Sequence, residues 1–325
     1  MSELDDLLAA QDGHFIWADA VRAGVPRRQI NARVARGELA HVGRGAYVEP
    51  RRLKPEELHR RRTVAVLRTH PGRIATHHSA AILLDLPVHQ ARLDMVHFGR
   101  SDTSGRRGRH WVLHRLPEEI ATVSVGTRGI AVPSVPPEVA AIQCVMLVGV
   151  RAGLVTMDAA LRQMVRAELK PKTKRWVPPA RSTPAVDAAF ETAFAAYART
   201  PGIERARRAF AMGDARRESP AESLAAYDLD LLHIAVTPQW PITVGDTTLR
   251  VDFRVDGTNV VIEVDGEGKY DEPEERPREK AREQQLRALG YDVVRIVWAD
   301  LGNLPKLRRL IEAAIARCAG ADLLP

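Results

Sequence analysis

The stretch LRVDFRVDGTNVVIEVD, residues 249–265, decides how the C-terminal part of the chain folds. Two apolar, β-branched arms flank an Asp-Gly dipeptide at residues 256–257, a pattern typical of a β-hairpin with a tight turn. A symmetric loop centred on this turn pairs Asp252 with Glu263. Directly opposed residues share a face of the sheet, with Cβ atoms roughly 5 Å apart. We therefore expect both carboxylates on one face.

Asp265 adds a third acid, since it lies two residues beyond Glu263 and points to the same face about 6.6 Å farther along the strand. The other face is expected to be apolar and to carry Val251, Phe253, Val255, Val260, Ile262 and Val264. Clustered carboxylates repel one another, and the usual reason to keep them is a hard cation such as Mg²⁺. A solvated edge hairpin is the alternative. The apolar surroundings of the acids favour the metal site.

Four motifs are spaced along the last third of the chain. They are Arg250-Val-Asp252-Phe, Val-Ile-Glu263-Val-Asp265-Gly266, Glu279-Lys280-Ala-Arg282-Glu283 and Gly290-Tyr-Asp-Val-Val-Arg295-Ile-Val-Trp298. Together they resemble the PD-(D/E)xK nuclease superfamily, especially its very-short-patch-repair-like branch, over about residues 219–301. The resemblance implies a restriction-endonuclease-like mixed sheet flanked by helices, and hydrolysis of DNA with Mg²⁺ or Mn²⁺.

The resemblance implies that Asp252, Glu263 and Asp265 are catalytic acids and metal ligands, with Asp265 or its carbonyl as the third ligand. Asp265 itself stands where the superfamily has a lysine. A lysine elsewhere in the chain can supply the positive charge that stabilises the phosphate, and Lys269 and Lys280 are the candidates.

Glu222 has two interpretations that do not exclude each other. Ser219 as N-cap, with Glu222 three residues later, predicts a capping box at the start of a helix. The nuclease resemblance instead implies that Glu222 is an additional catalytic carboxylate facing the site.

The N-terminal 50 residues predict a winged helix-turn-helix. Helices are expected at residues 3–12, 17–23 and 26–37, followed by a hairpin at residues 39–48 with a Gly-Arg-Gly tip. The last helix of such a domain can enter the major groove of DNA. Its basic face is either simply solvated or binds DNA. The residues expected to contact DNA are Arg27, Arg28, Asn31, Arg33 and Arg44.

Residues 1–50 also resemble the winged-helix domain of AbiEi-type antitoxins from type IV toxin–antitoxin systems, and residues 74–87 resemble the segment after that domain in the same family. The resemblance implies repression of the protein's own operon through double-stranded DNA, and a cognate toxin as a partner.

The whole chain is expected to be a multidomain α/β protein. We predict a winged helix-turn-helix domain at residues 1–52, a mixed α/β middle domain at 53–168, a linker at 169–183, and a nuclease-like domain with leading helices at 184–325.

Two features of the middle domain stay open. The basic loop at residues 99–109 is either a solvated hairpin tip or a phosphate contact. The adjacent His77 and His78 suggest a metal, but neighbouring residues diverge on any regular element and no cysteine is near. A role in a helix cap or in the core is therefore favoured for both.

Composition limits the class of partner. The 325 residues carry a net charge of +7, and the pI is near 9.7, which favours a polyanion such as nucleic acid. No apolar run is long enough to span a bilayer, and the acidic N-terminus lacks signal-peptide features, so a cytoplasmic protein is expected. Cys144 and Cys318 give neither a disulfide framework nor zinc spacing. An aromatic content of 5% argues against a platform that stacks single-stranded bases.

Two functions therefore remain. The first is a metal-dependent DNA endonuclease with a DNA-binding domain. The second is a non-catalytic transcriptional regulator of antitoxin type that keeps a degenerate nuclease fold.

Overall fold

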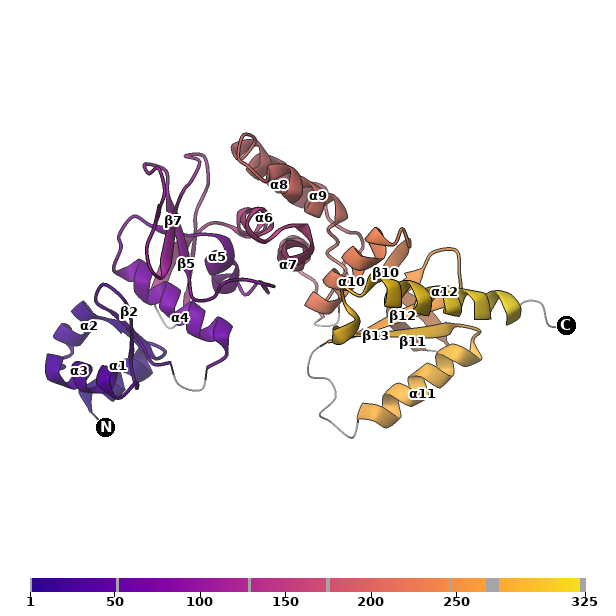
Figure 1. Ribbon diagram of the computed structural model, residues 1–325, viewed down its shortest axis with the longest axis horizontal. Helices are drawn as coiled ribbons and strands as arrows, with labels where there is room; N and C mark the ends of the chain where they lie inside the picture. The colour runs from indigo at the N-terminus through magenta and orange to yellow at the C-terminus, as the bar shows by residue number, and fades with distance from the viewer. Residues whose placement is uncertain are drawn as a thin grey trace. The chain divides into compact units, whose positions relative to one another are not determined.

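The computed structural model describes residues 2–50, 53–127, 130–173, 176–245, 247–266 and 275–321. The chain divides into two compact units, residues 1–156 with 187–208, and residues 157–186 with 209–325 (Figure 1). Helices and mixed sheets occur in both units, which confirms the multidomain α/β class. The finer domain boundaries stay a prediction. Among the described helices, none is both long and apolar enough to cross a membrane.

The first unit begins with a winged helix. Its elements are α1 (Glu3–Ala10), β1 (His14–Ile16), α2 (Trp17–Arg22), α3 (Arg27–Ala35), β2 (Ala40–Gly43) and β3 (Ala46–Val48). The strands form an antiparallel sheet in the order β1-β3-β2, and Leu4, Phe15 and Ile30 are fully buried beside it. The three helices and the hairpin confirm the expectation. Strand β1 was not expected, because three residues are too few to show an alternating pattern.

The rest of the first unit surrounds a six-stranded mixed sheet in the order β6-β7-β5-β4-β9-β8. The strands are β4 (Ile74–Ala75), β5 (Val96–Arg100), β6 (Arg106–Arg107), β7 (Trp111–Arg115), β8 (Val123–Thr127) and β9 (Ile130–Ser134). The helices after the winged helix along the chain are α4 (Pro55–Arg68), α5 (His77–Leu83), α6 (Pro137–Val148), α7 (Val150–Leu169), α8 (Pro184–Ala196) and α9 (Ile203–Met212). The last three each belong partly to the second unit, because the division of the chain falls at residues 156, 186 and 208. The basic loop at residues 99–109 contains β6, which pairs with β7.

The second unit is built on the predicted hairpin. Its sheet has the order β10-β11-β12-β13, with β10 (Val236–Val244), β11 (Thr247–Val255), β12 (Val260–Asp265) and β13 (Asp292–Val297). The first three strands are antiparallel, and β13 is parallel to β12. The helices are α10 (Pro220–Leu231), α11 (Glu275–Ala288) and α12 (Leu304–Ala321), with a 3₁₀ turn η2 (Trp298–Asp300). The mixed sheet and the crossover through α11 agree with the expectation.

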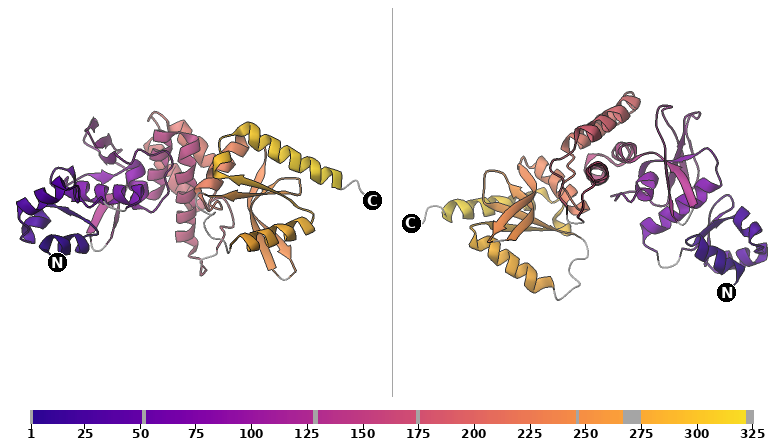
Figure 2. Two further views of the ribbon diagram at one scale, coloured as in Figure 1. Left: turned by 60° about the horizontal axis from the view of Figure 1, so that its bottom comes forward. Right: turned by 180° about the vertical axis from the view of Figure 1, so that it is seen from behind.

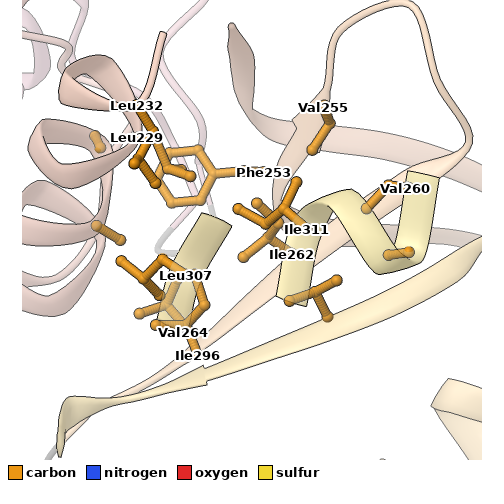
Figure 3. Packing of buried hydrophobic residues seen from close by; sticks show 14 of the residues in the cluster. Leu229, Leu232, Phe253, Val255, Val260, Ile262, Val264, Ile296, Leu307 and Ile311 are labelled. Atoms are coloured by element: carbon orange, nitrogen blue, oxygen red, sulfur yellow. The ribbon is translucent and has the colours of Figure 1, made fainter. Parts of the chain in front are cut away.

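The sheet of the second unit has helices on both faces, and Figures 1 and 2 show α12 and α11 on opposite sides of it. On the side of α10 and α12, Phe253, Ile262 and Ile296 are fully buried against Leu229 and Leu307 (Figure 3). On the side of α11 a smaller cluster contains Ile242, Val251, Val261, Leu286 and Val293. Both faces are therefore covered, unlike those of a solvated edge hairpin.

Val251 corrects one expectation, because it packs on the side of α11 and not with Phe253. The strand changes face at Asp252. Gln239 of β10 lies opposite Asp252 and has a φ of +53°. The residues before and after these two are paired between β10 and β11, but the ladder is interrupted at Gln239 and Asp252 themselves. A left-handed residue distorts the ladder locally as a bulge does, so the strict alternation that the sequence suggested is lost there.

Helix α11 gives a second correction. Ala281, Leu286 and Leu289 were expected to face inward, but only Leu286 is buried, while Ala281 is exposed and Leu289 is 45% exposed. The face of α11 that meets the sheet carries Arg282 together with Leu286, one turn apart. The inward stripe of this helix is thus partly charged.

These two leucines of α11 provide a matched test of the helix orientation. Leu286→Ala should lower the free energy of unfolding by about 2–5 kcal/mol, the range for a buried leucine. Leu289→Ala should change it by only about 0.5 kcal/mol, as for a surface position. Urea unfolding of the purified chain measures both. Equal effects of the two substitutions would contradict this orientation.

Candidate functional site

A small pocket of about 40 Å³ lies beside the hairpin on the side of α11. It is lined by Asp252, Glu263, Asp265, Arg282, Glu283, Leu286, Val293 and Arg295. The acids come from β11, β12 and α11, and the two arginines come from α11 and β13. The structure thus brings together the three carboxylates that the hairpin register predicted, and it adds two cations and a fourth acid.

The register of the hairpin places Asp252 opposite Glu263. Phe253 pairs with Ile262 and Arg254 with Val261, so the next step along the ladder aligns the two acids. Oδ2 of Asp252 accepts a hydrogen bond of 2.7 Å from the backbone N–H of Val264. The carboxylate of Asp252 is therefore fixed to the neighbouring strand, with one oxygen already engaged.

Glu263 forms an ion pair with Arg282. Nη2 of Arg282 donates to Oε1 of Glu263 at 2.8 Å and also to the backbone carbonyl of Arg250. The side chain of Glu263 is only 13% exposed. A half-buried carboxylate needs such a partner, since removing a charge from water is costly.

Asp265 is compensated in a similar way by Arg295, whose Nη1 lies 3.5 Å from Oδ2 of Asp265. Nε of the same guanidinium donates to Oε2 of Glu283 at 3.4 Å. Arg295 therefore lies between acids from β12 and α11. Sequence reasoning gave no role to Arg282 or Arg295, although both stand in the motifs that resemble the nuclease superfamily.

Glu222 is buried at the start of α10 and accepts two hydrogen bonds on Oε2, from the N–H of Glu218 at 3.0 Å and from Nε2 of Gln239 at 2.8 Å. The hydroxyl of Ser219 accepts the N–H of Glu222, as the capping box required. Glu222 itself reaches one residue further back, to Glu218 and not to the N-cap. Burial, and then the charge of Asp252, raise the pKa of Glu222 to about 7. The capping contact and a position near Asp252 thus coexist.

The two lysines proposed for the site differ in what can be said of them. Lys280 is exposed on α11, whereas Lys269 lies outside the described residues. Within the described part of the chain, the cations that line the pocket are arginines. A guanidinium offers donors in a planar fork that suits a phosphate.

The carboxylates of the pocket suit a hard cation only if water or substrate supplies the remaining ligands. In the described part of the chain, the one group with three ligand atoms within 4.8 Å of one another consists of histidines in the first unit. The carboxylates of the pocket thus form no closed cage. Mg²⁺ commonly uses one or two carboxylates together with water and substrate phosphate, and Asp252 and Glu263 could provide these.

The winged helix presents a second candidate surface. Arg27, Arg28 and Asn31 are exposed on α3, and Arg44 is exposed in the turn between β2 and β3. Arg33, which was expected to point outward with them, is instead only 19% exposed on its side chain.

Arg33 ties α3 to α1 through a 2.5 Å contact with Oδ1 of Asp5. This is a correction, and its cause is local. Asp5 belongs to the capping box of α1, so the start of that helix brings a carboxylate within reach of α3. Periodicity within α3 alone cannot reveal this partner.

Comparisons with known proteins give a family match for the N-terminal winged helix and a weak structural likeness to a nuclease domain. Residues 2–50 match the family described as "Transcriptional regulator, AbiEi antitoxin". This match supports a DNA-binding domain of AbiEi antitoxin type. No curated protein sequence matches the chain.

Among solved structures, the catalytic domain of the homing endonuclease I-Bth0305I is similar to this chain at 21% sequence identity. The likeness covers 30% of this chain and 95% of that domain, with a TM-score of 0.25. A score this low supports no conclusion about fold or activity. The membership of the C-terminal domain in the PD-(D/E)xK superfamily therefore stays a prediction.

The raised pKa of Glu222 gives a stability prediction. In the folded protein the pKa of Glu222 is about 7, above the ordinary value of 4.5. Its favourable contribution to the free energy of unfolding is therefore fully present below pH 4.5 and is lost as pH rises through 7. Glu222→Gln should therefore gain stability over the wild type between pH 5 and 8, by roughly 3 kcal/mol at most. Urea unfolding across this range measures the difference. The exposed Glu312→Gln is the control, and parallel pH curves for Glu222→Gln and wild type would contradict the burial of a neutral Glu222.

Proposed function

We propose that this protein binds duplex DNA through its winged helix and hydrolyses DNA phosphodiester bonds with its C-terminal domain. The observation that supports this most is the meeting of Asp252, Glu263 and Asp265 around one pocket, with Arg282 and Arg295 beside them. The match of residues 2–50 to AbiEi antitoxins supports the DNA-binding half.

In this proposal Asp252 and Glu263 hold Mg²⁺ or Mn²⁺, with Asp265 or its carbonyl as a third ligand. The metal, when bound, would activate a water molecule and neutralise charge on the scissile phosphate. Asp252 accepts the N–H of Val264 on one oxygen, and its side chain lines the pocket. Glu222 is buried near Asp252, whose charge helps to raise the pKa of Glu222, and it is not among the residues that line the pocket.

In this proposal Arg282 would supply the positive charge that a lysine supplies in the PD-(D/E)xK superfamily. Its Nη2 already lies 2.8 Å from Glu263, so the guanidinium is next to the proposed reaction centre. A phosphate oxygen could accept from the same guanidinium, and a fixed cation there stabilises the charge that develops on the phosphate. Lys269 remains a second candidate for this role.

A non-catalytic regulator is the second candidate function, and the Arg282–Glu263 ion pair favours it. A guanidinium bound to Glu263 competes with a metal for that carboxylate. Asp265 also stands in the position where nucleases of this type have a lysine. A regulator of this kind would bind its own operator, with a cognate toxin as its partner.

DNA binding can be tested on the exposed arginines of the winged helix. Replacing Arg28 and Arg44 by Ala should weaken duplex binding and reduce the slope of log K against log salt by about 0.9 for each lost phosphate contact. Arg36→Ala is the matched control, because Arg36 is also exposed near α3 but is paired with Glu38 at 2.7 Å. Fluorescence anisotropy over a salt series measures the effect. An unchanged slope in the double variant would show that DNA docks elsewhere.

Catalysis can be tested with Glu263→Gln, which keeps the shape of the side chain but removes the charge that a metal needs. Cleavage of plasmid DNA with Mg²⁺ or Mn²⁺ should fall by roughly 10²-fold or more, while duplex affinity in EDTA stays the same. The surface variant Glu312→Gln should cleave like the wild type. If wild-type protein binds duplex yet leaves it intact with either ion, the nuclease proposal fails and the regulator stands.

A further inference from the structure

Histidines gather on one side of the six-stranded sheet in the first unit. They come from α4, α5, β5 and β7, and they are His59, His77, His78, His97 and His114. Neighbouring rings in this group have centroids between 3.9 and 5.3 Å apart. A group of this density within a protein interior requires a physical explanation, since each ring carries two polar nitrogens.

Two of the five rings have ordinary structural partners. Nδ1 of His59 contacts the carbonyl of Leu93 at 2.9 Å, and its Nε2 contacts the hydroxyl of Ser79 at 2.8 Å. Nε2 of His78 contacts the carbonyl of Met95 at 3.1 Å. The core role that the sequence favoured therefore fits His78, and His59 shares it.

The other three rings converge on one point. Each of His77, His97 and His114 contributes a ring nitrogen, and these atoms lie within 4.8 Å of one another. Nδ1 of His97 and Nε2 of His114 share a hydrogen bond of 2.9 Å, which an ion bound to both nitrogens would replace. Three imidazoles around an ion with bonds of 2.0–2.1 Å have nitrogens roughly 3.3 Å apart, so side-chain rotations alone could close the set.

His77 is the member that a purely structural role explains least. It is buried, its Nδ1 has no hydrogen-bond partner among the described residues, and its backbone has a φ of +51°. A buried polar nitrogen without a partner is costly, and so is the left-handed region for a residue other than glycine. The backbone is kept there by Oε1 of Gln143, which accepts the N–H of His77 at 2.8 Å. Gln143 in turn donates to the hydroxyl of Tyr197 at 2.7 Å.

A cavity of about 410 Å³ borders two of the three rings, His97 and His114. Arg92 and Arg107 also line it, together with the apolar side chains of Met95, Val112, Leu147 and Val148. A ligand in the cavity would thus reach the ring pair from one side and find positive charge on its walls.

We propose that His77, His97 and His114 form a binding site for a divalent transition metal of the Zn²⁺ class, with a fourth coordination position open to this cavity. Imidazole nitrogen suits Zn²⁺, Cu²⁺, Fe²⁺ or Ni²⁺, whereas Mg²⁺ prefers oxygen. Three histidines and one open position are the arrangement that leaves room for water or a small anion. Arg92 and Arg107 favour an anion there. This site is separate from the carboxylate pocket of the second unit, both in residues and in the kind of ion.

Zinc titration of the full chain tests this site. The protein, stripped with a chelator and carrying Glu263→Gln to weaken the carboxylate pocket, should take up one equivalent of Zn²⁺ in isothermal titration calorimetry. Adding His114→Ala should remove this equivalent, because two imidazoles hold the ion poorly. His110→Ala is the matched control, since His110 is exposed four residues earlier in the chain and should leave binding unchanged. Retention of the equivalent in His114→Ala, or no uptake by the parent protein, would overturn the proposal.

A second measurement needs no variant that could misfold. X-ray absorption at the zinc edge of the loaded wild-type protein should show the scattering pattern of imidazole rings with three nitrogen ligands. Coordination by oxygen alone would overturn the proposal. Because this readout reports ligand type, it also distinguishes the histidine site from any ion held by Asp252 and Glu263.

Discussion

The hydrogen bond of 2.7 Å from the N–H of Val264 to Asp252 joins the two strands of the hairpin on which the second unit is built. Because the carboxylate takes a donor from the neighbouring strand, Asp252 is tied to the middle of the sheet. The strand changes face at this residue, and Val251 then joins the cluster under α11 while Phe253 packs under α10 and α12. This polar contact thus stands where both faces of the sheet become covered, and the three acids line the pocket on the side of α11.

The hairpin and the pairing of Asp252 with Glu263 could be predicted from the sequence, because turn chemistry and alternation are local signals. The role of Gln239 could not, since no local signal marks a non-glycine residue with a φ of +53°. Arg282 and Arg295 were equally hidden. Whether they point at the acids depends on how α11 and β13 pack on the rest of the sheet. Of the three apolar residues that the helical pattern placed inward on α11, only Leu286 is buried.

The histidine cluster of the first unit also could not be predicted from the sequence. His77 and His78 are adjacent, and both rings lie beside that of His97, so these neighbours diverge less than sequence reasoning expected. The partners of His77, however, stand in β5 and β7, and only the parallel pairing of these strands puts His97 and His114 beside each other. A spacing rule for metal ligands within one element cannot detect such a group of histidines, because sheet topology and not sequence distance brings them together.

Charge compensation links the two ways in which the carboxylate pocket could work. Glu263 is paired with Arg282 and Asp265 with Arg295, so folding does not need an ion to offset these acids. A metal that binds Glu263 must displace the guanidinium of Arg282, and that group then needs another anion. A DNA phosphate is such an anion, so in the proposed nuclease phosphate and metal would each favour the binding of the other, by the reciprocity that holds for any two coupled ligands. Without DNA, the ion pair would keep the pocket closed to the metal, which is a reason for a nuclease to tolerate an arginine on its own catalytic acid.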